Sequence, residues 1–368
     1  MKVALITIFQ VPNYGSVLQT FATQQILEQM GAEVHLINYN YPNEWHWQNG
    51  ARKPSGIRTW IRKLIPSKKI SNLDKFRSAY LHLTKCYDSL DALSAEDWSD
   101  YDAFVVGSDQ VWNPRFLHGD KTFMLSFVPD NKPRYSLASS FATDTLPENL
   151  RYKYYRELVK FEAISVREQN GVKIINNELN INKNVEVILD PTLLFPKEDW
   201  LRFIPRSSFQ KRKSYIVLYL LKYSFDPRPY IYDVVKYFQK KLDAEVIALC
   251  GYDKPEKTGG LLMENAFSSS VPRFIDIIAN ADLIVTNSFH GTAFGINFGI
   301  PLISIVPSGG DDDRQSTLLR SVCAENSICP IDTSISNIEP EYNRDTVSKR
   351  LADLRKQNIS WIKSNIMR

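Results

Sequence analysis

The sequence predicts an α/β fold made of two doubly wound, Rossmann-like domains with parallel sheets. Short apolar runs rich in β-branched residues alternate with stretches of helical spacing, which is the pattern of βαβ units. This alternation occurs once before and once after a segment bounded by Pro191 and Pro196. The 368 residues also exceed the length that one hydrophobic core usually spans, which favours two domains.

We expect the domain boundary at this segment, because two prolines stiffen a crossing between domains. Residues 1–195 then form the N-terminal domain and residues 196–342 the C-terminal domain. Residues 343–368 are expected to form a final amphipathic helix that can pack back on the N-terminal domain. Ligands of open parallel sheets bind beyond the carboxyl ends of the strands, so the two domains should face a cleft.

The first βαβ unit consists of a strand over residues 3–9, a helix over residues 16–30 and a strand from residue 33. Ser16 is the expected N-cap of the helix. The polar and small residues at this turn can either cap the helix or line the cleft. They are Asn13, Gly15, Ser16 and Gln19.

A denser polar motif follows the predicted strand over residues 101–106. Gly107 permits close approach of another backbone, and the polar side chains after it exceed what a simple turn requires. We therefore expect this motif to line the site through Gly107, Ser108, Asp109, Gln110 and Asn113.

Arg167 follows a further predicted strand over residues 163–166, between strands predicted over residues 134–142 and 185–189. An arginine at a strand end is suited to bidentate binding of phosphate or carboxylate. A surface ion pair with the adjacent Glu168 is the alternative interpretation.

His290 is the candidate catalytic residue of the C-terminal half. Residues 281–286 predict a buried strand, and residues 292–298 predict a short helix that Gly299 ends. His290 thus lies at a strand-to-helix corner, where free N–H groups and the helix dipole suit a phosphate or carboxylate. We expect an acid–base or binding role there, rather than a purely structural histidine.

The same corner supplies candidate donor ligands, with Ser288, Gly291 and Thr292 around the helix start and Arg314 in the next loop. Three aspartates precede Arg314 at positions 311–313. Because Mg²⁺ ligands usually come from several segments, we expect a solvated loop there and no metal site.

An insertion at about residues 42–75 carries Trp45, Trp47 and Trp60 together with a basic cluster. Aromatic rings stack on sugars and cations meet phosphates, so this excursion suits a sugar or an anionic acceptor. A solvated loop with a partly helical, amphipathic piece is the alternative interpretation.

The composition restricts the partners. The formal charge of +4 is too weak to imply nucleic acid, and the four cysteines form no CxxC pair. No apolar segment approaches the roughly 20 residues of a membrane span, and the N-terminus has no signal-peptide cleavage pattern. We expect a cytoplasmic protein with at most peripheral association with the inner face of the membrane. Nothing in the sequence indicates its oligomeric state.

In order along the chain, five motifs resemble the polysaccharide pyruvyl transferase family: NYGSVLQ, YDAFVVGSDQVWNP, SVREQNG, VILDPTLL and ADLIVTNSFHGTAFGINFGIPLISI. Together they span residues 1 to about 320. The resemblance implies a two-domain fold like that of GT-B glycosyltransferases, with the active site between the domains. Members transfer the pyruvate unit of phosphoenolpyruvate to a sugar in capsule, exopolysaccharide or cell-wall glycan synthesis, forming a ketal across two hydroxyls.

The family histidine falls on His290, which the resemblance implies as general acid or phosphate ligand, and the arginine of the RE motif falls on Arg167. Several members carry arginine two residues before the histidine, where this chain has Ser288. Arg314 or Arg167 must then supply the missing charge. In this scheme Asp109 accepts protons from the acceptor, and phosphoenolpyruvate is a substrate, so no cofactor is expected.

The predicted partners are phosphoenolpyruvate on the C-terminal, donor side and a sugar or lipid-linked oligosaccharide on the N-terminal, acceptor side. Two alternatives stay open. A GT-B glycosyltransferase with a nucleotide-sugar donor would use the same cleft, and a non-catalytic glycan-binding protein would use the tryptophans of the insertion.

Overall fold

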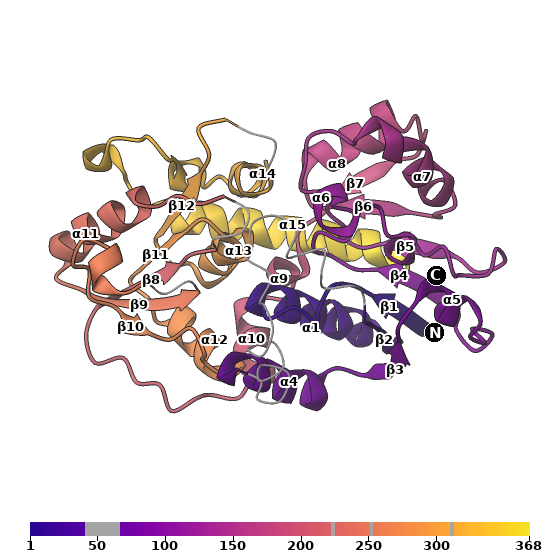
Figure 1. Ribbon diagram of the computed structural model, residues 1–368, viewed down its shortest axis with the longest axis horizontal. Coiled ribbons are helices and arrows are strands. Elements are labelled where there is room, and N and C mark those ends of the chain that lie inside the picture. The colour runs from indigo at the N-terminus through magenta and orange to yellow at the C-terminus, as the bar shows by residue number, and fades with distance from the viewer. Residues whose placement is uncertain (41–66, 222–224, 251–252, 310–312) are drawn as a thin grey trace, which may run out of the picture.

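The computed structural model describes residues 1–40, 67–221, 225–250, 253–309 and 313–368. Two α/β units lie side by side along the long axis of the molecule, and their helices flank parallel sheets (Figure 1). This arrangement confirms the predicted α/β class. Most of the 42–75 insertion, including its three tryptophans, lies outside the described residues.

The first unit contains a five-stranded parallel sheet with the order β3-β2-β1-β4-β5. The parallel pair β6-β7 extends it, because Ser139 N–H donates to Ser165 O (3.2 Å) beside β5. The strands are β1 (Lys2–Ile6), β2 (Glu33–Tyr39), β3 (Leu83–Tyr87), β4 (Ala103–Val106), β5 (Arg134–Ser136), β6 (Ile164–Val166) and β7 (Val185–Val187).

The second unit contains a six-stranded parallel sheet with the order β10-β9-β8-β11-β12-β13. In each sheet, the strands on one side of its first strand follow in reverse chain order and those on the other side in forward chain order. Ligand crevices of doubly wound folds form at the point where the order reverses. The strands are β8 (Tyr215–Tyr219), β9 (Glu245–Cys250), β10 (Glu264–Asn265), β11 (Leu283–Thr286), β12 (Leu302–Val306) and β13 (Ile328–Pro330).

Helices cover both sheets and connect the units. Those of the first unit are α1 (Tyr14–Gln29), α4 (Lys68–Tyr80), α5 (Leu90–Ser94), α6 (Pro114–Leu117), α7 (Glu148–Leu158) and α8 (Gln169–Lys173). The crossing and the second unit contain α9 (Pro191–Leu194), α10 (Lys197–Phe203), α11 (Tyr230–Leu242), α12 (Val271–Ala279), α13 (Phe289–Phe298), α14 (Arg314–Ser321) and the final helix α15 (Arg344–Asn365). No helix within these described parts of the chain is both long and apolar enough to cross a bilayer.

Several predicted boundaries are wrong, including the end of the first strand, which is Ile6 rather than residue 9, and three others that bear on the site. The N-cap of α1 is Asn13, whose side chain accepts the Gly15 N–H, so Ser16 lies inside the first turn. Helix α13 begins at Phe289 rather than at residue 292, so His290 belongs to its first turn. Strand β5 ends at Ser136, because Ala138 adopts a left-handed backbone (φ 55°) that a strand cannot continue.

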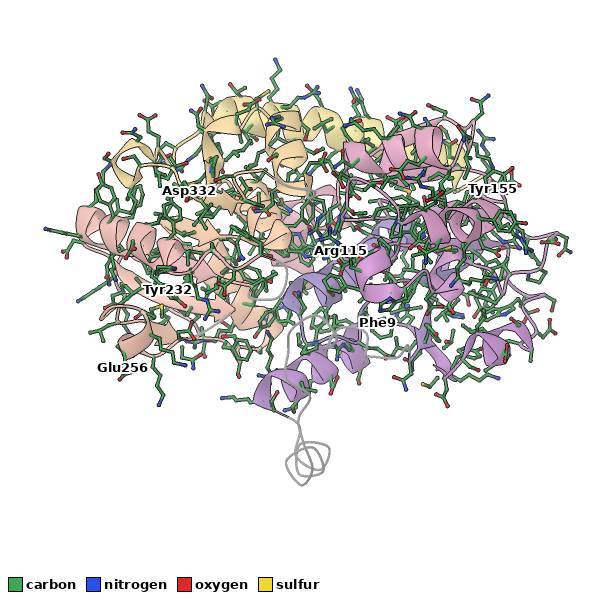
Figure 2. All side chains as sticks on the ribbon, turned by 45° about the horizontal axis from the view of Figure 1, so that its top comes forward. Phe9, Arg115, Tyr155, Tyr232, Glu256 and Asp332 are labelled. Atoms are coloured by element: carbon green, nitrogen blue, oxygen red, sulfur yellow. The ribbon has the colours of Figure 1, made fainter. Side chains whose placement is uncertain are left out.

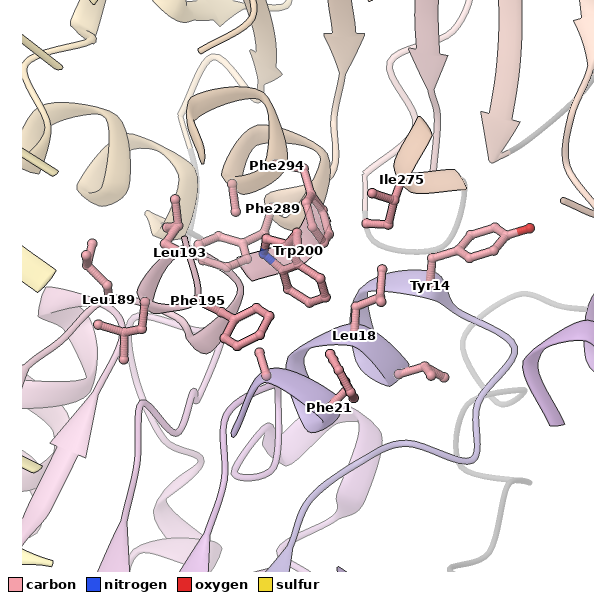
Figure 3. Close-up of a cluster of buried hydrophobic side chains, with 14 of the residues drawn as sticks. Tyr14, Leu18, Phe21, Leu189, Leu193, Phe195, Trp200, Ile275, Phe289 and Phe294 are labelled. Carbon is pink, nitrogen blue, oxygen red and sulfur yellow. The ribbon is translucent and has the colours of Figure 1, made fainter. Parts of the chain in front are cut away.

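A single apolar core crosses from one unit to the other. Phe21 of α1 lies 5.9 Å from the rings of both Phe195 and Trp200 in the crossing segment, and Trp200 lies 5.4 Å from Phe294 of α13 (Figure 3). Tyr14 stacks on Phe274 of α12 at 4.4 Å. Helix α1 is therefore buried on nearly all sides, and the two units share one packed interior.

Helix α15 joins the same junction by hydrogen bonds. Asn358 Oδ1 accepts the Leu189 N–H (2.9 Å), just before α9. Arg355 donates to Leu193 O and to Asn297 Oδ1 of α13, each at 2.7 Å. The final helix thus binds the crossing segment and the second unit together.

We expect Trp200→Ala to lower the unfolding free energy by about 3–5 kcal/mol, because it removes a fully buried ring from the shared core. Chemical denaturation measures this loss. The control is Leu262→Ala, whose side chain is 71% exposed and whose truncation should stay within about 0.5 kcal/mol. Equal effects of the two changes would contradict the shared core.

Candidate functional site

A cleft of about 780 Å³ opens between the two units, beyond the carboxyl ends of β4 and β11. Arg115, on its wall, lies near the middle of the molecule where the units meet (Figure 2). The first unit lines the cleft with Asn13, Asp109, Gln110, Asn113, Pro114, Arg115, Phe116, His118, Ala142 and Pro147. The second unit lines it with Leu221, Phe225, Asn287, Ser288, Phe289, His290, Pro307, Arg314 and Gln315.

The side chain of His290 is buried, and the groups around it are polar. Its side chain is 7% exposed, and its Nε2 atom lies 3.9 Å from Asp190 Oδ2, too far for a hydrogen bond. Among the described residues Nε2 has no hydrogen-bond partner. Gly15 of α1 packs against the other edge of the ring, where a Cβ would lie 2.2 Å from Nδ1. The ring is thus held between the two units with one nitrogen unsatisfied.

Burial lowers the pKa of His290 below its usual 6.5, although the carboxylates of Asp190 and Asp109 oppose this shift. Arg167 and Arg314 act in the same direction as burial. The imidazole is therefore neutral near pH 7. An anion that binds beside it would favour the charged form and raise its pKa.

Arg167 organises a buried ion-pair network behind the cleft wall. Its side chain is fully buried, with Nη1 2.7 Å from Asp190 Oδ2 and Nη2 3.5 Å from Asp109 Oδ1. Ser108 Oγ donates to Asp190 and Ser16 Oγ donates to Asp109, both at 2.6 Å. The alternative of a surface Arg167–Glu168 pair is wrong, because both residues are buried.

The two aspartates of this network are ionised. Burial alone would raise their pKa values, but the attraction of His290 when it is in its charged form, of Arg167 and of the hydroxyl donors outweighs it. The pKa of Asp190 is lowered to about 2, and that of Asp109 also lies below its usual value. Asp109 lines the cleft with a strained backbone (φ 75°), yet a low pKa makes it a weak proton acceptor.

Glu168 is a second buried carboxyl beside Arg167. Its Oε1 atom accepts the N–H groups of Phe141 (2.8 Å) and Ala142 (3.3 Å). Its Oε2 atom lies 4.0 Å from Arg167 Nε, and neither atom has a hydrogen-bond partner among the described residues. Burial raises its pKa to about 7. Glu168 thus fixes the turn at Ala142, which lines the cleft.

At the start of α13, the N–H groups of Phe289 and His290 are available to a ligand, rather than those of the expected Gly291 and Thr292. The N–H of Gly291 bonds to Ser288 Oγ (3.3 Å) and that of Thr292 to Ser288 O (2.9 Å). In the described part of the chain, the N–H groups of Phe289 and His290 have no such partner. Gly291 instead permits close packing, because a Cβ there would lie 2.4 Å from Thr286 Oγ1.

The structure divides the predicted site residues into two layers. The residues that line the cleft are Asn13, Asp109, Gln110, Asn113, Ser288, His290 and Arg314. Those that lie behind its wall are Gly15, Ser16, Gln19, Gly107, Ser108, Arg167, Gly291 and Thr292, all of them buried. The prediction that the second set meets ligand directly does not match this geometry.

Several lining residues were not predicted. Arg115, Phe116 and His118 follow the GSDQVWNP motif, in and just after the short helix that Asn113 caps. Asp190 was missed as a site residue, although it follows a strand of the same sheet as Arg167. An acidic residue at that edge was the signal that could have found it.

The sequence model of the polysaccharide pyruvyl transferase family matches residues 13–309, which contain all of the cleft-lining residues named above except Arg314 and Gln315. The chain belongs to the polysaccharide pyruvyl transferase family. The family of transferases inferred from the five motifs is thereby confirmed. Comparison with curated proteins gives no match.

Solved structures similar to this chain have the GT-B-like fold, as predicted. The UDP-GlcNAc 2-epimerase of Neisseria meningitidis, bound to UDP-GlcNAc, has a TM-score of 0.57 at 11% identity, over 99% of this chain and 100% of its own. A putative UDP-N-acetylglucosamine 2-epimerase of Listeria monocytogenes gives 0.54 at 11%, over 99% and 96%. The S. aureus MnaA–UDP structure gives 0.53 at 12%, over 97% and 90%. Identities this low support the fold alone.

We expect Gly15→Ala to displace the imidazole, because the new Cβ would overlap Nδ1 of His290. The displaced ring should gain solvent, so its pKa should rise toward 6.5. NMR titration of the five histidines, with His290→Ala to assign the signal, measures this shift. An unchanged His290 resonance and titration would contradict the tight contact.

We expect Glu168→Gln to remove a pH dependence of stability. The pKa of Glu168 is raised from 4.5 to about 7, so its contribution is fully present below pH 4.5 and is lost as pH rises through about 7. Urea denaturation at about pH 5 and about pH 8 should therefore show a larger loss of unfolding free energy in the wild type than in the variant. Parallel losses would exclude the raised pKa.

Proposed function

We propose that this protein transfers the pyruvate unit of phosphoenolpyruvate to a sugar and forms a ketal with two of its hydroxyls. The observation that carries the proposal is His290, a neutral buried imidazole whose unsatisfied Nε2 lies at a polar interdomain cleft in a pyruvyl transferase family member. We place the reaction in the cytoplasmic assembly of a capsular, exopolysaccharide or cell-wall glycan.

The donor would bind at the second unit's side of the cleft. Arg314 lines the cleft and lies 5.9 Å from the Phe289 ring, so its guanidinium can meet a phosphate or carboxylate next to His290. The open N–H groups at the start of α13 add hydrogen-bond donors at the positive end of the helix dipole. Arg314 thereby becomes our candidate for the charge absent at Ser288, since it lines the cleft whereas Arg167 lies behind the cleft wall.

The chemistry begins with a proton on His290. The phosphate and carboxylate of the donor raise the imidazole pKa, so His290 takes up a proton as the donor binds. That proton passes to the methylene carbon of the enol, and the first sugar hydroxyl attacks C2 and loses its own proton. Cleavage of the C2–O bond to phosphate then lets the second hydroxyl attack C2. The products are the pyruvyl ketal and inorganic phosphate. One of the two hydroxyl protons passes to the phosphate, and the other restores the proton that His290 gave to the methylene carbon.

The acceptor would lie along the first unit's wall. Gln110 and Asn113 are joined by a 2.6 Å side-chain hydrogen bond there, which fixes amide groups for sugar hydroxyls. The exposed side chains of Arg115 and His118 continue this wall outward. The low pKa of Asp109 makes it a hydrogen-bond acceptor for a hydroxyl rather than a strong base in this proposal.

The experiment is incubation with phosphoenolpyruvate and a panel of oligosaccharide and lipid-linked acceptors, with phosphate release and the pyruvyl mass increment as readouts. His290→Ala should lower the rate by roughly 10²–10⁴-fold, because the proton donor is lost. The matched control is His35→Ala, since His35 lies on β2 and bonds to Tyr101. Unreduced phosphate release with a folded His290→Ala variant would remove His290 from the chemistry.

A nucleotide-sugar donor remains the second candidate, because two of the similar solved structures carry UDP-GlcNAc or UDP. A thermal-shift titration distinguishes the two, since a ligand that binds only the native state raises its apparent stability. We expect phosphoenolpyruvate to raise the melting temperature. A response to UDP-sugars with none to phosphoenolpyruvate would favour a glycosyltransferase.

A further inference from the structure

The ring of Phe289 lies beside two arginines where the units meet. Phe289 is the first residue of α13, is 6% exposed and belongs to the shared apolar core (Figure 3). The Cζ atom of Arg167 lies 4.3 Å from the ring centroid, and that of Arg314 lies 5.9 Å from it. The ring of His290 is nearly perpendicular to it, with 5.4 Å between the centroids. One aromatic side chain is thus flanked by two guanidinium groups and the imidazole of the site.

Phe289 forms a partition between the cleft and a small cavity behind the cleft wall. Phe289 lines both spaces, whereas Arg314 belongs to the wall of the cleft and Arg167 to the wall of the cavity. The cavity measures about 50 Å³ and is also lined by residues of α9, α14 and α15. The two guanidinium groups therefore approach the ring from the cleft and from the cavity, respectively.

The two arginines depend on this ring to different degrees. Arg167 is fixed by its ion pair with Asp190 at 2.7 Å, whatever the ring does. Arg314 is 7% exposed, and the like charge of Arg167 on the same ring repels it. The buried carboxyl of Glu168 attracts Arg314, and the negative face of the Phe289 ring adds an attraction that is strongest where water is excluded. The ring therefore favours the inward position of Arg314.

We propose that Phe289 is a positioning residue for the donor: its ring holds the guanidinium of Arg314 at the cleft wall, beside His290. Since Ser288 carries no charge, the cation on this wall comes from α14, and the ring of α13 is the surface against which it rests. An anion in the cleft then meets a guanidinium that is already in place, so less side-chain freedom is lost on binding. This role rests on the proposed function, which assigns Arg314 to the donor anion.

Helix α13 supplies a matched control at its other end. Phe298, its last residue, is 3% exposed, and Lys197 Nζ lies 5.8 Å from the centroid of its ring. Phe298 thus shares the residue type, the helix, the burial and a cation at nearly the same distance. It lies in the shared core, outside the described wall of the cleft. Its truncation should therefore reproduce the loss of packing without affecting the site.

The test is isothermal titration of the full chain with phosphoenolpyruvate and, separately, with inorganic phosphate. Phe289→Leu keeps an apolar side chain but removes the ring face, so both ligands should bind about 3- to 30-fold more weakly. Phe289→Tyr keeps the ring and should bind within about twofold of the wild type. Phe298→Leu should bind like the wild type.

A double-mutant cycle separates positioning from packing. Arg314→Gln removes the cation that the ring holds. In that background, the further change Phe289→Leu should alter binding by less than about twofold, because the two side chains act as one unit. A loss that came only from disturbed packing would be the same in both backgrounds.

Melting temperatures check that each variant folds, and Phe289→Met, whose unbranched side chain adapts to the space, replaces the leucine variant if that one does not. The proposal is overturned if Phe289→Leu binds as tightly as the wild type, if Phe289→Tyr does not restore binding, if Phe298→Leu loses as much, or if the loss persists without Arg314. A wild type that binds neither ligand would overturn this role together with the donor site. Intact binding without ketal formation would overturn the proposed activity alone.

Discussion

The buried ion pair between Arg167 and Asp190 is the constraint on which the site depends. The two groups are 2.7 Å apart, neither side chain is exposed, and each follows a different strand of the first sheet. Ser108, after β4, bonds to the same carboxylate. A buried pair is tolerated only when its polar atoms find partners, and losing one charge typically costs about 3–5 kcal/mol. Three strand ends must therefore keep their register, and this fixes the cleft wall before any ligand arrives.

His290 receives its properties from both units. Its ring projects from α13 of the second unit, whereas the glycine against it and the nearest carboxylate belong to the first unit. Burial favours the neutral imidazole. In the proposed reaction, uptake of the proton is thus coupled to arrival of the anionic donor. The shared apolar core supplies the rigidity that this two-sided environment needs.

Much of the fold could be predicted because buried parallel strands read as continuous apolar runs, as in residues 283–286. The helix starts were harder. Asn13 and Ser16 are both good N-caps, and only the three-dimensional path of the turn decides between them. The sequence also led to His290 and Asp109 at the cleft. It could not reveal that carboxylates occupy Arg167, because that pairing depends on the register of strands separated by long stretches of chain.

The continuity of the apolar core between the units limits how such a protein can diversify. Phe21, Trp200 and Phe294 come from both halves of the chain. Either half produced alone would therefore expose a large apolar surface and aggregate. Hybrids made by joining halves of distant relatives should suffer the same mismatch. New acceptor preferences are then expected to arise in the segments at the rim, such as the stretch after Asn113, rather than through exchange of entire lobes.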